Sequence, residues 1–228
     1  MYNTGKQGLS RNVACWYKDI CKLDCHNCVR YRTMCDMLER SGLPKAQWYP
    51  KKLVPTTPED KITFGKLKDI QRKIDKYITY GYSIFLSSIE SGTGKTSWAI
   101  KMLLSYFDKI WSMAGNEVNG MFIHVPTLLC QLKNFNNPLS EEYIENIKNC
   151  DVVIWDDIAT STLTDYEYNQ LLILIDARIN NRKTNIYTSN VVTKDELIRV
   201  LGARLASRVY NTSIVAVLTG KDTRGIEL

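Results

Sequence analysis

The segment Ser91-Gly-Thr-Gly-Lys-Thr-Ser97 decides how the chain is expected to fold. It follows an apolar, strand-like run at 82–88 and precedes a helix-like run at 98–107. A strand, a glycine loop, a Lys-Thr pair and a helix in this order are the context of a phosphate-binding P-loop. The glycines let backbone N–H groups approach an anion closely, and the helix N-terminus adds partial positive charge. The segment therefore predicts a nucleotide-binding loop.

The roles of single residues in this loop follow from the same arrangement. Lys95 is expected to reach the β- and γ-phosphates of ATP, and the Thr96 hydroxyl to ligate Mg²⁺. Ile89 stands where the usual pattern has its first glycine, so the turn off the strand must be formed differently. The alternative is a glycine turn that precedes a helix by chance. The predicted phosphate-binding set is Ser91, Gly92, Thr93, Gly94, Lys95, Thr96 and Ser97.

From residue 82 onward, strand-like and helix-like runs alternate. Two of the helices are expected to begin with capping boxes, Thr164-x-x-Glu167 and Thr193-x-x-Glu196. The alternation predicts an α/β fold, a P-loop NTPase core with a five-stranded parallel sheet flanked by helices. A ligand would then bind at the carboxyl ends of the strands. The expected strands are 84–88, 121–125, 152–155, 185–188 and 214–218.

Two carboxylates follow the apolar strand at 152–155. A buried strand that delivers carboxylates at its C-terminal end is what a Walker B element requires. Asp156 is expected to hold Mg²⁺ together with Thr96. Asp157 is expected to polarise the attacking water, although its side chain is one methylene shorter than the usual glutamate. The alternative is that the two aspartates only cap a loop.

Polar residues near the C-terminal strands complete the predicted catalytic set. Asn190 ends the strand-like run at 185–188 and fits a position that orients the attacking water, or else it only forms a turn. Arg204 and Arg208 are four residues apart, so they share one face of a helix. An arginine that reaches the γ-phosphate of a neighbouring subunit contributes about 10³–10⁵ in rate. The alternative for each arginine is a surface ion pair.

The distribution of charge bears on the partners. Residues 1–80 carry 16 Lys/Arg and 8 Asp/Glu, which is a net charge of +8, whereas the remainder is near neutral. A basic first third is typical of a surface that faces nucleic acid or an acidic protein, or else it is simply solvated. The chain has no apolar stretch that could span a bilayer and starts without a signal-peptide segment, so we expect a cytoplasmic protein with no membrane partner.

Five of the seven cysteines lie in the first 35 residues. Such a cluster in a cytosolic chain favours metal binding over disulfides. The preferred interpretation is a tetrahedral Zn²⁺ site formed by Cys15, Cys21, Cys25 and Cys28, with Cys35 or His26 as substitute ligands. Cys35 is left out of the preferred set because it falls in a helix-like run. A [4Fe–4S] cluster is the alternative cofactor.

Together, the P-loop, the Asp156-Asp157 element, the Ser189-Asn190 tip and the Leu201-Gly-x-Arg-x-x-x-Arg helix resemble the AAA+ ATPases of the DnaC and DnaI helicase-loader type. The likeness extends to replication proteins of phages of Gram-positive bacteria and covers about residues 60–220. The cysteines predict a metal-binding module at 1–40, which we expect to dock the helicase, and the Pro-punctuated stretch after it predicts a linker at 41–63. The resemblance implies an AAA+ ATPase domain at 64–228 without a full helical lid. A basic helix is expected at 66–80.

The resemblance also implies an activity and partners. The expected activity is ATP hydrolysis, slow alone and stimulated by assembly or DNA, with Arg208 as the arginine finger in trans and Arg204 in support. The expected partners are a replicative DnaB-family helicase, single-stranded DNA, and further copies in a ring or helical oligomer. If the protein is phage-encoded, it would act in the cytoplasm of the bacterial host. The DNA contact would come from 124–135 through Lys133 and Phe135, unless this stretch is a core helix carrying Leu128, Leu129 and Leu132.

Three other functions compete with this interpretation. A P-loop nucleoside or nucleotide kinase would need a basic lid and an acceptor site, and neither is visible in the sequence. A transposition-helper ATPase of the IstB type has a closely related domain. A nucleotide-gated DNA-binding adaptor with little turnover is compatible with Ile89 and Asp157.

Overall fold

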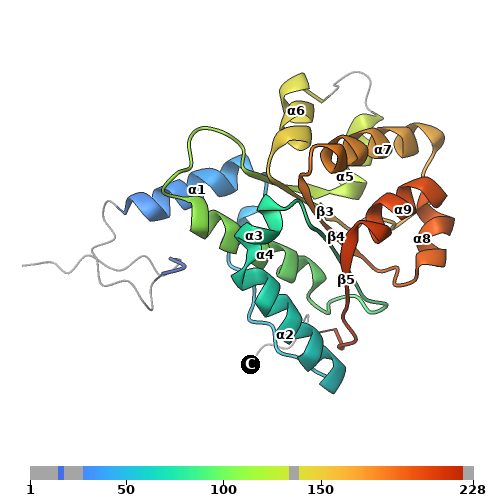
Figure 1. The fold of residues 1–228 in the computed structure, drawn as a ribbon, viewed down its shortest axis with the longest axis horizontal. Coiled ribbons are helices and arrows are strands. Elements are labelled where there is room, and N and C mark those ends of the chain that lie inside the picture. Colours follow the sequence, from blue (N-terminus) through green and yellow to red (C-terminus); the bar gives the residue numbers. More distant parts are fainter. Residues whose placement is uncertain (1–14, 18–27, 134–138, 223–228) are drawn as a thin grey trace, which may run out of the picture.

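The computed structural model describes residues 15–17, 28–133 and 139–222. Its centre is a sheet of five parallel strands in the order β2-β3-β4-β1-β5 (Figure 1). The predicted α/β architecture with a five-stranded parallel sheet is therefore confirmed, and each strand lies within one residue of its expected bounds. The strands are β1 Ser83–Ser87, β2 Gly120–His124, β3 Val152–Asp156, β4 Thr184–Ser189 and β5 Ser213–Val217.

Helices cover both faces of the sheet, because successive side chains of a strand point to opposite faces. Ile84 and Leu86 of β1 face one hydrophobic cluster, whereas Phe85 faces the other. The first cluster packs against α1 Val29–Arg40, α2 Pro58–Arg72, α3 Ile74–Thr79 and α4 Lys95–Ile110. The second packs against α5 Val125–Leu132, α6 Glu141–Asn149, α7 Asp165–Asn180, α8 Lys194–Leu201 and α9 Ala203–Asn211 (Figure 1).

Local signals explain where several helices begin. Both predicted capping boxes are confirmed, at Thr164 with Glu167 for α7 and at Thr193 with Glu196 for α8. The basic helix expected at 66–80 is wrong in its bounds, since the structure has two helices there. Thr57 caps α2, which therefore begins at Pro58, and the non-helical backbone of Lys73 separates α2 from α3.

The described part of the N-terminal region packs on the same core as the sheet. Met34, Met37 and Leu38 of α1 are almost fully buried in the cluster that contains α4. A short 3₁₀ helix, Lys45–Gln47, precedes Trp48, which is also buried in this cluster. Residues 28–48 therefore pack against the sheet domain.

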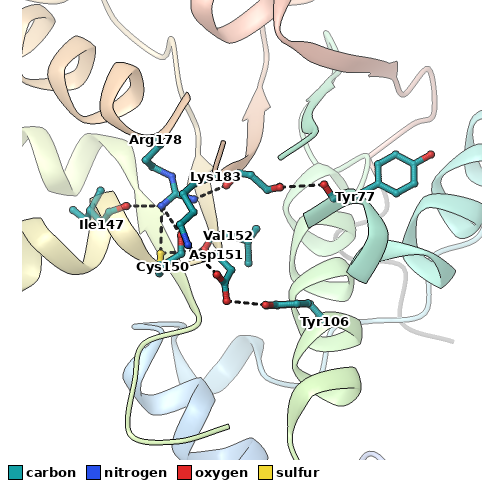
Figure 2. A network of polar contacts seen from close by, with 9 residues as sticks. Tyr77, Tyr106, Ile147, Cys150, Asp151, Val152, Arg178 and Lys183 are labelled. Atoms are coloured by element: carbon teal, nitrogen blue, oxygen red, sulfur yellow. Dashed lines mark hydrogen bonds and ion pairs between the residues drawn. The ribbon is translucent and has the colours of Figure 1, made fainter. Parts of the chain in front are cut away.

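A buried arginine joins several elements at the amino ends of the strands. Arg178 of α7 is fully buried and donates to the carbonyl oxygens of Ile147 and Cys150 (Figure 2). It also donates to the carbonyl oxygen of Thr184 and to Oδ1 of Asn185. Two of these carbonyls lie at the C-terminal end of α6, where a cation is favoured by the helix dipole. This network lies at the end of the sheet opposite to the P-loop.

Candidate nucleotide-binding site

The P-loop follows β1 and leads directly into α4, as the sequence predicts. Gly92 and Gly94 have positive φ values of 71° and 97°, which glycine adopts without strain. Gly94 is the N-cap of α4, so the N-terminus of the helix, with its partial positive charge, lies at the end of the loop. Lys95 is 6% exposed, and its Nζ donates to the Glu90 carbonyl oxygen at 3.1 Å. The lysine is thus held beside the loop that would surround a phosphate.

Thr96 and Asp156 come together across the site. Thr96 Oγ1 donates to Asp156 Oδ1 at 2.7 Å, and Thr188 Oγ1 of β4 donates to the same oxygen at 2.8 Å. Burial raises the pKa of the Asp156 carboxyl above its ordinary value, and the two hydroxyl donors oppose this shift. A hydroxyl and a carboxylate side by side are oxygen ligands of the kind that Mg²⁺ prefers. The residues present therefore fit the magnesium ion of Mg-ATP.

Asp157 lies next to Asp156 with a φ of 58°, and its N–H donates to Thr188 Oγ1 at 2.9 Å. Its Oδ2 lies 3.7 Å from Nε2 of His124, which ends β2, and His124 Nδ1 lies 2.8 Å from Thr127 Oγ1. The carboxylate is partly exposed and faces the site at the carboxyl ends of the strands. Its nearest described partner is therefore an imidazole.

Asn190 follows β4 directly and is exposed. Since β4 lies between β3 and β1 in the sheet, Asn190 is at the same edge as Asp156 and the P-loop. It makes no hydrogen bond within the residues that the structure describes. The structure thus gathers the P-loop, both aspartates and Asn190 at the carboxyl ends of three neighbouring strands.

Arg204 and Arg208 do not join this group within one chain. Both lie on α9 and pair with Asp176 of α7, with Arg208 Nε 2.6 Å from Oδ1 and Arg204 Nη2 3.4 Å from Oδ2. Their side chains remain 65% and 42% exposed for Arg204 and Arg208, respectively. The ion-pair alternative therefore describes their state in the single chain, with one acidic partner for two guanidinium groups.

The candidate DNA-contacting segment is mostly a core helix. Leu128 and Leu129 of α5 are buried, as the alternative interpretation expects. Lys133 Nζ lies 2.9 Å from Oε1 of the buried Glu167, so much of its charge is neutralised. Phe135 lies outside the described residues.

Only part of the predicted zinc set can be placed. Cys15 is buried and its Sγ accepts a hydrogen bond from the Tyr17 N–H, whereas Cys28 Sγ accepts from the Tyr31 N–H and caps α1. Cys35 lies in α1 as expected, and burial raises the pKa of its thiol. Cys21, Cys25 and His26 lie outside the described residues. Within the described ranges, which leave out three of the candidate ligands, no three potential ligands are grouped so as to hold a metal ion, so the described residues do not support the predicted zinc site.

Two residues of the site were missed by sequence reasoning, Thr188 and His124. The signal for Thr188 was its place at the end of a strand adjacent to the Walker B strand, since Trp155 pairs with Tyr187. The signal for His124 was equivalent, because it pairs directly with Asp156 in the parallel register. In both cases the neighbouring strand had to be known first.

The strand order, the glycine loop after β1 and the carboxylates at the end of β3 define an α/β fold with a nucleotide-binding loop at the carboxyl ends of its parallel strands. No protein-family model and no curated protein matches this chain. Among solved structures, the chain is similar to the DnaC helicase loader, with 18% identity and a TM-score of 0.64 over 77% of this chain and 100% of that one. It is similar to DnaI, with 17% identity and a TM-score of 0.62 over 80% and 94%.

A third similar structure is AMPPCP-bound DnaA from Aquifex aeolicus, with 15% identity and a TM-score of 0.56 over 75% of this chain and 51% of that one. At these identities the likeness establishes the fold. The predicted resemblance to DnaC and DnaI is confirmed at this level. Across the described part of the chain, none of the helices has the length and apolar character needed to cross a membrane.

Proposed function

We propose that the protein is an ATPase that acts in DNA replication as a loader of a replicative, DnaB-family helicase. The observation that carries this proposal is the contact of Thr96 with Asp156 beside Lys95, in a fold similar to that of the DnaC helicase loader. Backbone N–H groups of the P-loop and Lys95 would bind the β- and γ-phosphates of ATP. Thr96 and Asp156 would hold the magnesium ion, which neutralises charge on the phosphates.

Asp157 and Asn190 are placed to act on water in this proposal. Asp157 would accept a proton as a water oxygen bonds to the γ-phosphorus and the bond to the β,γ-bridging oxygen breaks, which releases ADP. Asn190 would orient the same water. The geometry supports these roles through the shared edge of β3 and β4, because parallel strands deliver their carboxyl ends to one side.

Assembly would complete the site. Arg208, with Arg204 in support, would leave Asp176 and stabilise the γ-phosphate of ATP bound to a neighbouring subunit in a ring or helical oligomer. Their high exposure and the absence of both arginines from the site of their own chain support an action in trans. Hydrolysis would then depend on assembly. ATP binding would hold the loader on the helicase and on single-stranded DNA, and hydrolysis would release it.

The N-terminal region would dock the helicase, with 1–40 as a docking module, 41–63 as a connection and 64–228 as the ATPase domain. Zinc binding by its cysteines stays a hypothesis from spacing alone, and no step of the proposal depends on a metal there. Zinc analysis of the full-length protein, with Cys25→Ser as the comparison, tests it. About one equivalent of zinc per protein chain, lost in Cys25→Ser, would support the zinc hypothesis.

Co-elution with the helicase tests the loading function. The full-length protein, mixed with a DnaB-family replicative helicase and ATP, should elute as a complex in size exclusion and dissociate after hydrolysis. A transposition helper of the IstB type would hydrolyse ATP and bind DNA without this complex. A small-molecule kinase would transfer phosphate to an acceptor rather than to water.

A nucleotide-gated DNA-binding adaptor with little turnover is the second candidate. The position of Asp157 favours it, because the side chain is one methylene shorter than the usual glutamate and its Oδ2 lies 3.7 Å from Nε2 of His124, a neighbour that would compete with water for this carboxylate. ATP-dependent DNA binding without hydrolysis, in the presence of the helicase, would identify this function.

A further inference from the structure

A cavity of about 1310 Å³ lies between α2, the outer side of α4 and the segment around Trp16 and Tyr49. Its α4 residues, Lys101, Leu104, Ser105 and Asp108, recur at helical spacing. They begin two turns after Lys95, so the cavity is separate from the P-loop at the start of the same helix. A volume of this order is large enough to enclose a small ligand or part of a chain.

Two cations of this cavity are not matched by an anion. Arg72 pairs with Asp69, and Lys109 pairs with Asp75 outside the lining. The ammonium groups of Lys68 and Lys101 have no hydrogen bond or ion pair with any residue that the structure describes. Lys101 is half-buried, and burial lowers the pKa of its ammonium group. Burying a cation without a partner is unfavourable, so an anion bound here would be stabilised.

The carboxylates of the cavity are already satisfied. Asp69 is engaged by Arg72, and Asp108 accepts hydrogen bonds from Tyr17 Oη at 2.5 Å and from Arg30. They therefore do not neutralise the two lysines. Further exposed lysines near the cavity add to the positive field, Lys61 and Lys66 on α2 and Lys73 directly after it.

Aromatic rings form the opposite wall of the cavity. Trp16 stacks on Tyr49 with ring centres 4.9 Å apart and an interplanar angle of 20°. Trp16 is fixed by a hydrogen bond from Nε1 to the Trp48 carbonyl oxygen at 2.9 Å, and Arg30 lies over the Tyr17 ring. Tyr49 remains 41% exposed. A rigid, partly exposed aromatic pair beside uncompensated lysines suits a ligand with flat rings and phosphates.

We propose that this cavity binds a segment of single-stranded nucleic acid, with phosphate at Lys68 and Lys101 and a base against the Tyr49–Trp16 pair. The proposal rests on the proposed function, which requires contact with single-stranded DNA. It would add a second DNA contact to the one predicted at Lys133, whose ammonium group is paired with Glu167 in the single chain. A strand is favoured over a free nucleotide because the basic surface of α2 continues beyond the cavity.

Fluorescence anisotropy with a fluorescein-labelled dT20 oligonucleotide, recorded over a range of salt concentrations, tests the charges. Lys68→Met/Lys101→Met should bind more weakly, and the slope of log K against log salt should decrease by about 1.4, since each phosphate contact on a single strand contributes about 0.7. The matched control, Lys194→Met/Arg199→Met, removes two exposed cations of α8, which packs on the other face of the sheet, and should retain the slope. Equal slopes for the two double variants would overturn the proposal.

A steric variant tests the cavity without changing its charge. Gly65 of α2 lines the cavity, and a Cβ built on it meets no atom within 4 Å. Gly65→Leu should therefore fold, with a better helix former than glycine, and weaken dT20 binding by partly filling the space. Thermal unfolding of the variant checks the fold. A folded Gly65→Leu that binds dT20 as the wild type does would contradict the proposal.

Photo-crosslinking locates the strand directly. An oligonucleotide with 5-iodo-dU should crosslink to Trp16 or Tyr49, identified by mass spectrometry, and excess dT20 should compete whereas dTMP should not. Competition by dTMP alone would indicate a free nucleotide instead. Binding of polyglutamate that depends on Lys68 and Lys101, with no dT20 binding, would indicate an acidic peptide as the ligand instead.

The DNA site and the loader function can fail separately. If the protein forms the helicase complex and hydrolyses ATP but does not bind dT20, the proposed DNA site is wrong and the loader proposal stands.

Discussion

Thr96 Oγ1 lies 2.7 Å from Asp156 Oδ1, so the first turn of α4 and the end of β3 meet through a hydroxyl and a buried carboxylate. The residues come from segments 60 positions apart. Asp156 is 5% exposed, and burial raises its pKa. Burying this carboxylate costs stability, yet it lies where a magnesium ion would bind. We infer that Asp156 serves function at the expense of stability.

Replacing this carboxylate should separate activity from stability. Because the pKa of Asp156 is raised in the folded protein, ionisation disfavours folding; this effect is absent below the ordinary aspartate range and fully present at pH 7. Asp156→Asn should lower ATP hydrolysis by about 10²-fold or more, as expected for the loss of an electrostatic stabiliser. It should raise the unfolding temperature at pH 7 by about 2–4 °C for each kcal/mol relieved.

Differential scanning calorimetry at pH 7 and near pH 4 measures this effect, and the gain should shrink at the lower pH because the raised pKa increases the protonated share of Asp156 in the folded wild type. Asp36→Asn, an exposed carboxylate on α1, is the matched control and should change neither quantity. An Asp156→Asn variant less stable than the wild type at pH 7 would show that the carboxylate contributes to folding.

The paired arginines should act between subunits. Arg208→Ala should lower the hydrolysis rate of the assembled protein by about 10³-fold or more, the range of an arginine finger. Lys95→Ala should also be inactive, yet a mixture of the two variants should regain activity, because one supplies the P-loop and the other the arginine. Steady-state hydrolysis of the mixture measures this, with Arg199→Ala on α8 as the control for an exposed arginine. A mixture that assembles but stays inactive would exclude action in trans.

The buried Arg178 should be important for stability and remote from catalysis. Arg178→Met removes the donor to three carbonyl oxygens, and each buried acceptor left without a partner costs about 1–3 kcal/mol. Since neighbouring groups relax, we expect a total loss of about 2–5 kcal/mol in the free energy of unfolding. Arg178→Lys should be intermediate. Urea unfolding measures the loss, and Arg199→Met on the exposed side of α8 should stay within about 0.5 kcal/mol of wild type.

Much of the fold was predictable because its signals are local. The P-loop glycines, the capping Thr164 and Thr193 and the apolar strand before Asp156 each act over a few residues. The placement of α2 was less accurate. Its basic, apolar-spaced run was visible, but its start depends on Thr57 and Pro58 within a stretch that otherwise reads as a connection.

The rest of the site depends on contacts between distant segments. Neither Asp176 as the partner of Arg208 nor Glu167 as the partner of Lys133 follows from local spacing, since each pair joins different elements. The same holds for His124, whose neighbour Asp157 follows another strand. Helix packing and sheet register bring these groups together, and the sequence alone does not specify either.

The rate of ATP hydrolysis by the wild type and Lys95→Ala, with and without single-stranded DNA and the replicative helicase, tests the central claim most directly. The account predicts wild-type turnover that rises with helicase or DNA and is lost in Lys95→Ala, although the variant keeps its fold. Turnover that is absent under every condition, or that is equal in the two proteins, would contradict an ATPase built on this P-loop.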